Sequence, residues 1–329
     1  MKKIYYYFFV FLLGSSTSLT FPPYNLFFLN FIIFPSFLQI LFLSKKNNFN
    51  INNFFILGCL FGYGFFLSGI YWITISLTFD ESFKYLIPIA LILIPFLLAL
   101  FYGFLLIALF PFIKRTINFV LIFSIFFSLM EYLRSTILTG FPWNLIGYTW
   151  SWSNESIQIL SIIGTYSLGL FSITLYSLPF LFLSNKIKTK EIVFSLFFVV
   201  LFLSNYFYGL KSLNKSEEIA FNKTKIFIVS PSFNLGRYSS FLNEEEKIKK
   251  LIEISEPTDS QKAIYIWPEG ILSHNTTNDL AKFKHLFSEF SENHLVVLGA
   301  NNIVYSEGKK NIYNSLIVVD HEANLIATY

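Results

Sequence analysis

Residues 86–112 read LIPIALILIPFLLALFYGFLLIALFPF, and this stretch decides the class of fold. It holds no Asp, Glu, Lys or Arg, whereas an ordinary soluble domain carries about 25% charged residues. The full chain of 329 residues is 54% hydrophobic and only 13% charged. Because about 20 consecutive apolar residues can cross a bilayer as one helix, the sequence predicts a membrane protein.

Two further charge-free runs, Ile4–Ser44 and Asn47–Phe79, extend this pattern toward the N-terminus. Together with the apolar segments that follow residue 112, they predict seven membrane-spanning helices. The expected spans are residues 5–20, 24–43, 54–78, 86–112, 117–138, 157–184 and 191–209.

The first of these spans has a second interpretation. Lys2 and Lys3 precede an apolar core, as in a cleaved signal peptide. Phe21-Pro22-Pro23 is not a small-residue cleavage site, however, and another span follows at once. A retained membrane helix is therefore the expectation.

Lys and Arg mark one side of the predicted bundle. They fall at the N-terminus and in every second loop, and the other loops are not strongly basic. The positive-inside rule then places the N-terminus in the cytoplasm, and seven crossings place residues 211–329 on the opposite side. The basic residues are Lys2, Lys3, Lys45, Lys46, Lys114, Arg115, Lys186, Lys188 and Lys190.

The net charge of +4 comes from this membrane part. Residues 211–329 hold 13 Lys and Arg against 15 Asp and Glu, which gives a net charge of −2. A nucleic-acid partner is therefore not implied.

The chain divides into two parts at a polar stretch. Residues 1–210 are expected to form the helical bundle, residues 211–220 a linker, and residues 221–329 an α/β domain. In that domain, strands alternate with two segments of helical spacing, Asn243–Ile254 and Thr277–Phe290, of which the second could be capped by Thr276-Thr277-Asn278. The expected strands are Lys225–Val229, Ala263–Ile266, Leu295–Leu298, Ser315–Val319 and Leu325–Thr328.

A single carboxylate follows the second expected strand, in Trp267-Pro268-Glu269. Active residues of α/β folds gather at the carboxyl ends of strands, so Glu269 is a candidate general base. A solvated loop glutamate next to a strand-ending proline is the alternative.

The segment between the fifth and sixth spans, Thr139–Tyr148, is rich in Gly, Pro and aromatic residues. It could form a structured loop at the membrane interface, although a plain aromatic belt would have a similar composition. Just before it, Glu131 and Arg134 stand three residues apart on one expected helix. Charged residues within a span usually pair or face a cavity, so we expect either an ion pair or a lipid-headgroup contact by Arg134.

Cysteine and histidine offer little chemistry. The single cysteine, Cys59, lies in the middle of an apolar span, where a small packing residue is expected. The four histidines are scattered and have no spacing typical of metal ligands, so neither a metal nor a cofactor is expected.

Several motifs in this order resemble the bacterial apolipoprotein N-acyltransferases, in which a membrane bundle is joined to a nitrilase-like (carbon–nitrogen hydrolase) domain. No motif is specific alone, but their order and spacing match through most of the chain. The matching motifs are Pro22-Pro23-Tyr24-Asn25, Gly62-Tyr63-Gly64, Gly69-Ile70-Tyr71-Trp72 with Ser76, Glu131-Tyr132-Leu133-Arg134, Thr139-Gly140-Phe141-Pro142-Trp143-Asn144 with Gly147-Tyr148, Gln158 with Gly164-Thr165-Tyr166-Ser167-Leu168, the looser Val229-Ser230-Pro231-Ser232-Phe233, Trp267-Pro268-Glu269 and Tyr313-Asn314-Ser315.

The resemblance implies an αββα nitrilase-like fold for residues 221–329 and a place in the bacterial inner membrane, with that domain in the periplasm. It also implies transfer of an acyl chain from a phospholipid to the N-terminal amine of a diacylglyceryl-cysteine lipoprotein, through a thioester on the enzyme. Glu269 matches the catalytic glutamate of the family. Trp143, Arg134, Trp267 and Asn314 are then expected to contact substrate.

The family's catalytic triad also contains a lysine and a cysteine, which follow the glutamate along the chain. The resemblance places the lysine soon after a tyrosine that Tyr329 matches, so both residues are expected beyond this sequence. We therefore expect a C-terminally incomplete domain, no activity of this chain alone, and either a longer chain or a second chain that completes the site.

Two other functions fit parts of the pattern. The first is a non-catalytic polytopic membrane protein with a degenerate nitrilase-like domain. The second is another carbon–nitrogen hydrolase relative that acts on a small amide, although such a protein would need neither seven spans nor the Gly140–Tyr148 loop.

Overall fold

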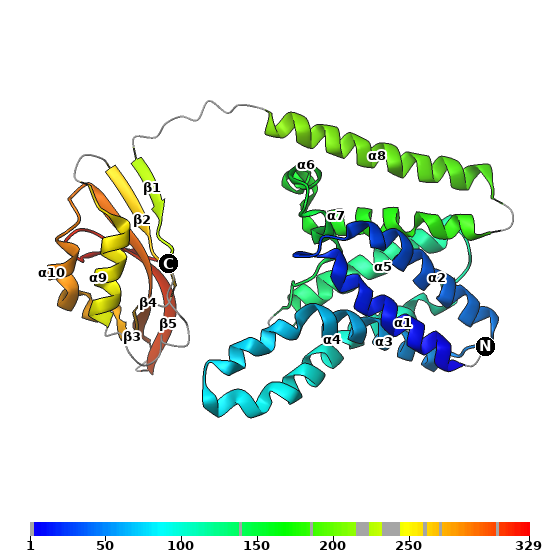
Figure 1. Ribbon diagram of the computed structural model, residues 1–329, viewed down its shortest axis with the longest axis horizontal. Helices are drawn as coiled ribbons and strands as arrows, with labels where there is room; N and C mark the ends of the chain where they lie inside the picture. Colours follow the sequence, from blue (N-terminus) through cyan, green and yellow to red (C-terminus); the bar gives the residue numbers. More distant parts are fainter. Residues whose placement is uncertain are drawn as a thin grey trace. The chain divides into compact units, whose positions relative to one another are not determined.

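The computed structural model describes residues 3–137, 140–184, 187–214, 224–231, 244–258, 262–269, 272–306 and 309–329, with the backbone alone at 272–276 and 278. It forms two compact units, Met1–Ser216 and Glu217–Tyr329 (Figure 1). Their boundary falls inside the expected linker at 211–220, of which residues 215–220 lie outside the described part.

The first unit is a bundle of α-helices. Six helical segments in the described residues are long and apolar enough to cross a membrane: Phe27–Lys46, Ile51–Thr78, Glu81–Phe112, Ile117–Thr136, Leu160–Leu183 and Thr189–Leu213. These confirm the second to seventh expected spans. The α-helices are α1 (Lys3–Thr17), α2 (Asn30–Lys46), α3 (Ile51–Ile70), α4 (Ile87–Leu109), α5 (Ile117–Thr136), α6 (Asn154–Ile157), α7 (Leu160–Ser177) and α8 (Thr189–Leu213).

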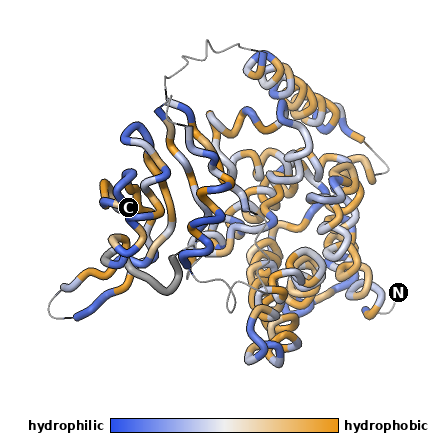
Figure 2. The backbone as a smooth tube through the Cα atoms, turned by 60° about the vertical axis from the view of Figure 1, so that its left-hand side comes forward, coloured by the Kyte–Doolittle hydropathy of each residue, from blue (hydrophilic) through white to orange (hydrophobic). Residues whose placement is uncertain are grey.

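The first expected span, residues 5–20, corresponds to α1 and a 3-10 turn at Ser18–Thr20. At 15 residues, α1 is short for a span of its own, yet it packs along α3 within the bundle. The number of seven crossings stays a prediction. Figure 2 shows that hydrophobic residues cover most of the length of these helices.

Glycines set how closely the bundle helices approach. A Cβ atom at Gly14 of α1 would lie 2.0 Å from the carbonyl oxygen of Phe61 in α3. A Cβ atom at Gly58, also in α3, would lie 2.1 Å from the carbonyl oxygen of Tyr102 in α4. Lipid supplies little hydrophobic drive for helix association, so such close backbone packing is the main source of stability.

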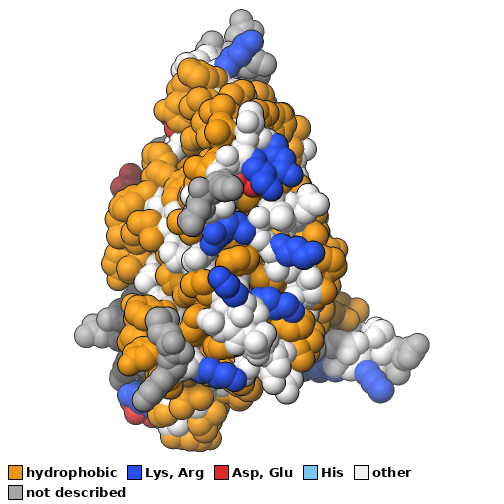
Figure 3. Space-filling view, turned by 90° about the vertical axis from the view of Figure 1, so that its right-hand side faces the viewer, with side chains coloured by type: hydrophobic (Ala, Val, Ile, Leu, Met, Phe, Trp, Pro, Cys, Tyr) orange, Lys and Arg blue, Asp and Glu red, His pale blue; other side chains and the backbone are white. Residues whose placement is uncertain are grey.

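Basic side chains gather at one end of the bundle (Figure 3). Lys3 Nζ donates to Asn53 Oδ1 over 3.2 Å, which joins the starts of α1 and α3. At the same end, Lys45 Nζ lies 3.0 Å from the Phe110 ring centroid, and Arg115 Nη1 donates to the Leu183 carbonyl over 2.9 Å. The prediction that the basic residues lie on one side of the bundle is thus confirmed for the described residues. Lys2 and Lys186 lie outside them.

The second unit is a mixed sheet in the order β1-β2-β4-β5-β6, with β3 paired to β4. Strands β1, β2, β3 and β4 are parallel, and β5 and β6 continue antiparallel. All five expected strands are confirmed, and β3 was not expected. The strands are β1 (Thr224–Ile228), β2 (Lys262–Ile266), β3 (Leu272–Thr276), β4 (His294–Ser306), β5 (Lys309–Val319) and β6 (Leu325–Thr328).

Helices cover one face of this sheet (Figure 1). Helix α9 (Glu244–Ser255) confirms the first expected helix, apart from Asn243, which lies outside the described residues. The second expected helix is a 3-10 helix (Thr277–Phe283) followed by the short α10 (Lys284–Phe287). Thr277 donates its hydroxyl to Asn302 Oδ1 over 3.1 Å, and the side chains of its expected partners in the cap lie outside the described part.

The core of the unit lies between the sheet and these helices. Every second strand residue points into it, including Ala263, Tyr265, Val296, Leu298 and Ile317. Residues of the opposite set are open to solvent in the described structure: Ile228 is 80% exposed and Leu316 is 48% exposed. The expected helical bundle followed by an α/β domain is therefore confirmed.

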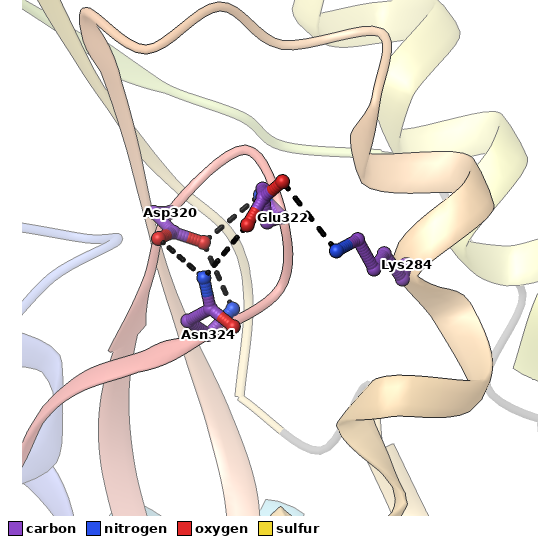
Figure 4. Close-up of polar contacts among 4 residues, drawn as sticks. All are labelled: Lys284, Asp320, Glu322 and Asn324. Carbon is purple, nitrogen blue, oxygen red and sulfur yellow. Dashed lines mark hydrogen bonds and ion pairs between the residues drawn. The ribbon is translucent and has the colours of Figure 1, made fainter.

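The turn between β5 and β6 is held by a polar cluster (Figure 4). Asp320 Oδ1 accepts the backbone N–H groups of Glu322 and Asn324 over 2.9 and 2.8 Å, and Asp320 Oδ2 accepts Asn324 Nδ2 over 2.9 Å. An ion pair of 3.4 Å from Lys284 to Glu322 ties the turn to α10. Burial raises the pKa of Asp320, but the hydrogen bonds from Asn324 and Glu322 outweigh it and leave that pKa below its ordinary value.

Candidate functional site

Glu269 is the third residue after Ile266, where β2 ends at the carboxyl edge of the parallel strands β1, β2 and β4. The backbone N–H of Trp267 donates to the Val297 carbonyl over 2.8 Å, which keeps the chain on the sheet up to Pro268. The Glu269 side chain then reaches β5, where Asn314 Nδ2 donates to Glu269 Oε1 over 2.6 Å. The structure thus brings together two expected site residues that are 45 positions apart in the sequence.

A cavity of about 280 Å³ lies at this pair. Glu269 and Asn314 form its polar part, and Ile266, Val297 and Leu316 are among its apolar walls. The alternation of strand side chains places these wall residues on the face opposite α9 and α10. The arrangement is one carboxylate, oriented by an amide, beside an apolar pocket, which suits proton transfer to or from a bound group.

Trp267 has most of its indole on the other side of the strand. The side chain is 4% exposed, and its Nε1–H donates to Ser255 Oγ over 3.0 Å. Its ring packs against Phe287 and Phe290 at centroid distances of 5.6 and 6.1 Å. Trp267 also lines the cavity, so its expected contact with substrate stays a prediction beside an observed packing role.

In the bundle, Arg134 holds the loop that follows α5. Its Nη1 donates to the carbonyl oxygens of Phe141 and Trp143 over 2.5 and 2.8 Å. The backbone N–H of Phe141 returns a 2.8 Å hydrogen bond to the Arg134 carbonyl. Gly140 makes this return possible, because its φ of 76° lies in the left-handed region. Thr139, the first residue of the expected loop, lies outside the described residues.

Glu131 holds the far end of the same loop. Its Oε1 accepts the backbone N–H of Ile146 over 2.8 Å. Glu131 and Arg134 are each 2% exposed, and both form hydrogen bonds to the loop. Among the described residues, no ion pair within 4.0 Å joins the two side chains. The buried guanidinium also lies 5.1 Å from the Phe66 ring centroid. The expected contact of Arg134 with a lipid headgroup or substrate stays a prediction.

This loop is one wall of a second cavity, of about 430 Å³. Trp143 is 52% exposed and meets Trp72 edge-on at 5.4 Å between ring centroids. Asn144 lies against Gly69, where a Cβ atom would come within 2.4 Å of Asn144 Nδ2. The other walls come from residues 18–24 and 68–72 and from Tyr148 and Ser151. Residues from three motifs of the sequence therefore meet at one aromatic and weakly polar pocket. They are Pro22-Pro23-Tyr24, Gly69 with Tyr71-Trp72, and Trp143-Asn144.

Tyr148 lines that cavity and is partly exposed. Burial is the main cause that raises the pKa of its hydroxyl above the ordinary value, and the charges of Tyr166 and Glu131 add to it. The hydroxyl therefore stays protonated and can donate a hydrogen bond to an oxygen in the pocket.

No group of three or more His, Cys, Asp or Glu side chains within the described ranges could hold a metal ion. The Asp320–Glu322–Asn324 turn is instead satisfied by its own hydrogen bonds. The sequence pattern missed the cavity of the bundle as a unit, because its walls are distant in sequence and carry no charged residue.

Comparison with known proteins identifies a family. The model of the apolipoprotein N-acyltransferase N-terminal domain matches residues 13–178. Apolipoprotein N-acyltransferases of Brucella melitensis and Rickettsia prowazekii are 26% and 31% identical, each over 97% of this chain. That of Rickettsia bellii is 33% identical over 66% of this chain and 43% of its own length. The chain spans 62% and 63% of the length of the first two relatives.

Proposed function

Because the chain belongs to the apolipoprotein N-acyltransferase family, we propose that it takes part in the transfer of an acyl chain from a membrane phospholipid to a lipoprotein. The acceptor is the N-terminal amine of a cysteine that already carries a diacylglyceryl group. The family match covers residues 13–178 of the membrane bundle, and the similarity to the relatives extends over 97% of the chain, including the sheet unit.

The proposed reaction has two steps. A thiolate attacks the ester carbonyl of the phospholipid, a thioester forms, and the lysophospholipid alkoxide leaves with a proton. The lipoprotein amine then attacks the thioester carbonyl, an amide forms, and the thiolate is released. Both steps need a group that accepts and returns a proton, as is typical of covalent acyl transfer.

Glu269 is proposed as that proton acceptor. The observation that carries this proposal is the 2.6 Å hydrogen bond from Asn314 Nδ2 to Glu269 Oε1 beside a cavity with apolar walls. The amide fixes one carboxylate oxygen and leaves the other for the reacting group. Asn314 is therefore proposed to position the base, and Trp267 to hold the turn that carries it.

We propose that the thiolate comes from a cysteine outside these 329 residues. The single cysteine, Cys59, lies in α3 within the first unit, where its Sγ would be 2.6 Å from a Cβ atom at Gly103. That position is helix packing within a membrane span, and such a site does not favour a thiolate. The chain alone is accordingly proposed not to form a thioester, and a longer chain or a second chain would complete the site.

The cavity at Trp143 and Tyr148 is proposed to receive the polar part of a lipid substrate. Aromatic residues with one polar tip suit the interface between headgroups and acyl chains. This end of the bundle lies opposite the basic end, so the positive-inside rule places it on the periplasmic side of the inner membrane. If the chain crosses the membrane seven times, as predicted from the sequence, the C-terminus of α8 also lies on the periplasmic side.

The test joins this chain to the C-terminal region of the Rickettsia prowazekii relative that follows the matched part. The fusion is expressed in bacteria depleted of their own N-acyltransferase, and the N-terminus of a reporter lipoprotein is analysed by mass spectrometry. We expect N-acylation with the fusion, none with Glu269→Gln, and full activity with Glu292→Gln, which alters an exposed glutamate before β4. N-acylation at the wild-type rate in the Glu269→Gln fusion would refute the role of Glu269.

A further inference from the structure

Arg134 has more hydrogen-bond donors than the loop after α5 accepts. Its Nη1 donates to the carbonyl oxygens of Phe141 and Trp143, whereas Nε and Nη2 are buried and have no hydrogen-bond partner among the described residues. Nε and Nη2 together carry three of the five N–H groups of a guanidinium. They lie near the end of a helix that is apolar enough to cross a membrane. Because unpaired buried donors on a charged group are costly, acceptors are expected beside them.

The Tyr102 hydroxyl in α4 is one acceptor near this cation. Tyr102 is 3% exposed, and its hydroxyl oxygen has no hydrogen-bond partner in the part of the chain that the structure describes. The Phe66 ring centroid lies 5.8 Å from the Tyr102 ring centroid and 5.1 Å from the guanidinium carbon of Arg134. The charges of Arg134 and Glu131 both act on the Tyr102 hydroxyl, so these three polar groups lie in one neighbourhood inside the bundle.

Two further oxygen atoms lie on the face of α5 that carries Arg134. Ser128, Glu131 and Arg134 follow one another at intervals of three residues, so their side chains share that face. A Cβ atom at Gly169 of α7 would lie 3.2 Å from Glu131 Oε2 and 4.0 Å from Ser128 Oγ, so both oxygens approach the same backbone. Ser128 Oγ is buried and has no hydrogen-bond partner within the described ranges. Glu131 binds the loop through Oε1, which leaves Oε2 for another donor.

The opposite charges of Glu131 and Arg134 do not meet directly. Their helical spacing would allow an ion pair, yet none within 4.0 Å joins them in the described structure. The unused donors of Arg134 do not reach Tyr102 or Ser128 directly either, because the hydroxyl oxygens of both residues lack a hydrogen-bond partner there. Facing polar groups beyond hydrogen-bond distance are commonly bridged by water, and a buried water needs two to four polar partners.

We propose that a buried water molecule joins Arg134 to Glu131 and also binds the hydroxyl groups of Tyr102 and Ser128. The water accepts an N–H of Arg134 and the O–H of Tyr102, and it donates to Glu131 Oε2 and Ser128 Oγ. One carboxylate balances one guanidinium, so the site suits a neutral ligand and not a further ion. The bridge ties α4 and α5 to the loop at residues 140–148, and it is independent of the reaction proposed above.

Radiolytic footprinting of the whole chain in lipid nanodiscs tests for this water. X-rays split a bound water into a hydroxyl radical where it lies, and mass spectrometry then locates the oxidised side chains. Phe66 and Tyr102 are buried, so their oxidation is expected only if water is held beside them. Phe37 is the matched control, because it is 1% exposed and its ring contacts the rings of Phe61 and Phe123. Phe66 and Tyr102 as unreactive as Phe37 would overturn the proposal.

Tyr102→Phe adds a test in which the two possibilities differ in sign. A buried hydroxyl without a partner destabilises the fold, so its removal would raise the midpoint of thermal unfolding or leave it unchanged. A hydroxyl bound to water stabilises the fold, and its removal should lower the midpoint by about 2–4 °C, the shift for one hydrogen bond in a unit of this size. We expect the lower midpoint, together with less oxidation of Phe66.

Tyr63→Phe is the control for this substitution. Tyr63 lies on α3, is partly exposed and lines an apolar cavity, so loss of its hydroxyl should change neither the midpoint nor the oxidation of Phe66. A midpoint of Tyr102→Phe at or above that of the unchanged chain would show that the Tyr102 hydroxyl binds no water.

Discussion

Replacement of Arg134 by alanine should release the loop that carries Trp143. The guanidinium Nη1 donates to the carbonyl oxygens of Phe141 and Trp143 over 2.5 and 2.8 Å, and the side chain is 2% exposed. Alanine removes both donors and also leaves the buried carboxylate of Glu131 without the nearby positive charge. The effect is expected at residues 140–148, because the bonds of Arg134 end on that loop.

The size of the effect follows from these contacts. Hydrogen bonds to a charged group contribute about 1.5–3 kcal/mol each, and removing one partner of a buried charged set costs about 3–5 kcal/mol. The two figures describe overlapping contacts and are not added. A loss of about 3 kcal/mol in the free energy of loop opening corresponds to roughly a hundredfold faster amide exchange.

Hydrogen exchange measured by mass spectrometry, on the chain in lipid nanodiscs, provides the assay. The informative amides are those of Phe141 and Ile146, which donate to the Arg134 carbonyl and to Glu131 Oε1. Lys84→Ala, at an exposed ion pair with Glu81, is the control and should leave their exchange unchanged. Exchange of the 140–148 peptide within threefold of wild type in Arg134→Ala would show that the guanidinium does not hold the loop.

Three further predictions concern other parts of the chain. Asn314→Ala should lower lipoprotein N-acylation by the fusion protein at least roughly tenfold, through loss of the bond to Glu269, with no change in the thermal unfolding of the sheet unit; equal activity would mean that Asn314 does not position the base. The folded-state pKa of Asp320 is lowered, so its contribution to stability is complete above the unfolded pKa of about 3.9 and is lost as the pH falls through the folded pKa. Asp320→Asn should therefore weaken the acid dependence of unfolding below about pH 4, as followed by circular dichroism, and an unaltered acid profile would contradict this. Gly58→Leu should prevent close packing of α3 on α4, because even a Cβ atom at this position would lie 2.1 Å from the Tyr102 carbonyl oxygen, and should lower the midpoint of thermal unfolding in detergent. An unchanged midpoint would show that this close approach is not needed.

Much of the fold could be predicted because its cause is local. A charge-free stretch such as residues 86–112 has few stable states other than a membrane helix, and α4 with its flanking 3-10 turns follows it closely. The short, uninterrupted apolar run Leu295–Leu298 likewise predicted a strand, and β4 contains it. Strand β3 was missed, because Leu272–Thr276 is mostly polar and its pairing with β4 is decided by tertiary contacts.

The site was harder to predict than the fold. Glu269 could be singled out from its place after a strand, since the carboxyl ends of parallel strands meet at one edge. Its hydrogen bond with Asn314 could not be derived from spacing, because the register of β4 with β5 decides which residue of β5 reaches the carboxylate. The cavity at Trp143 likewise depends on how the loop folds over α3, and the composition of the loop alone does not determine this.

The pair Glu131 and Arg134 shows what helical spacing can and cannot establish. Three residues of separation put both side chains on one face of α5, and this was correct. Spacing says nothing about what lies opposite that face. In the structure a loop lies there, and its backbone supplies two carbonyl acceptors for Arg134 and one N–H donor for Glu131. Buried charges within a membrane helix need partners, and unpaired loop backbone needs them equally. The charged side chains thus hold the loop at both ends through Arg134 Nη1 and Glu131 Oε1, although Nε and Nη2 of Arg134 have no hydrogen-bond partner in the described structure. This explains why two charged residues stand at the end of an otherwise apolar span and why the loop can keep a defined shape.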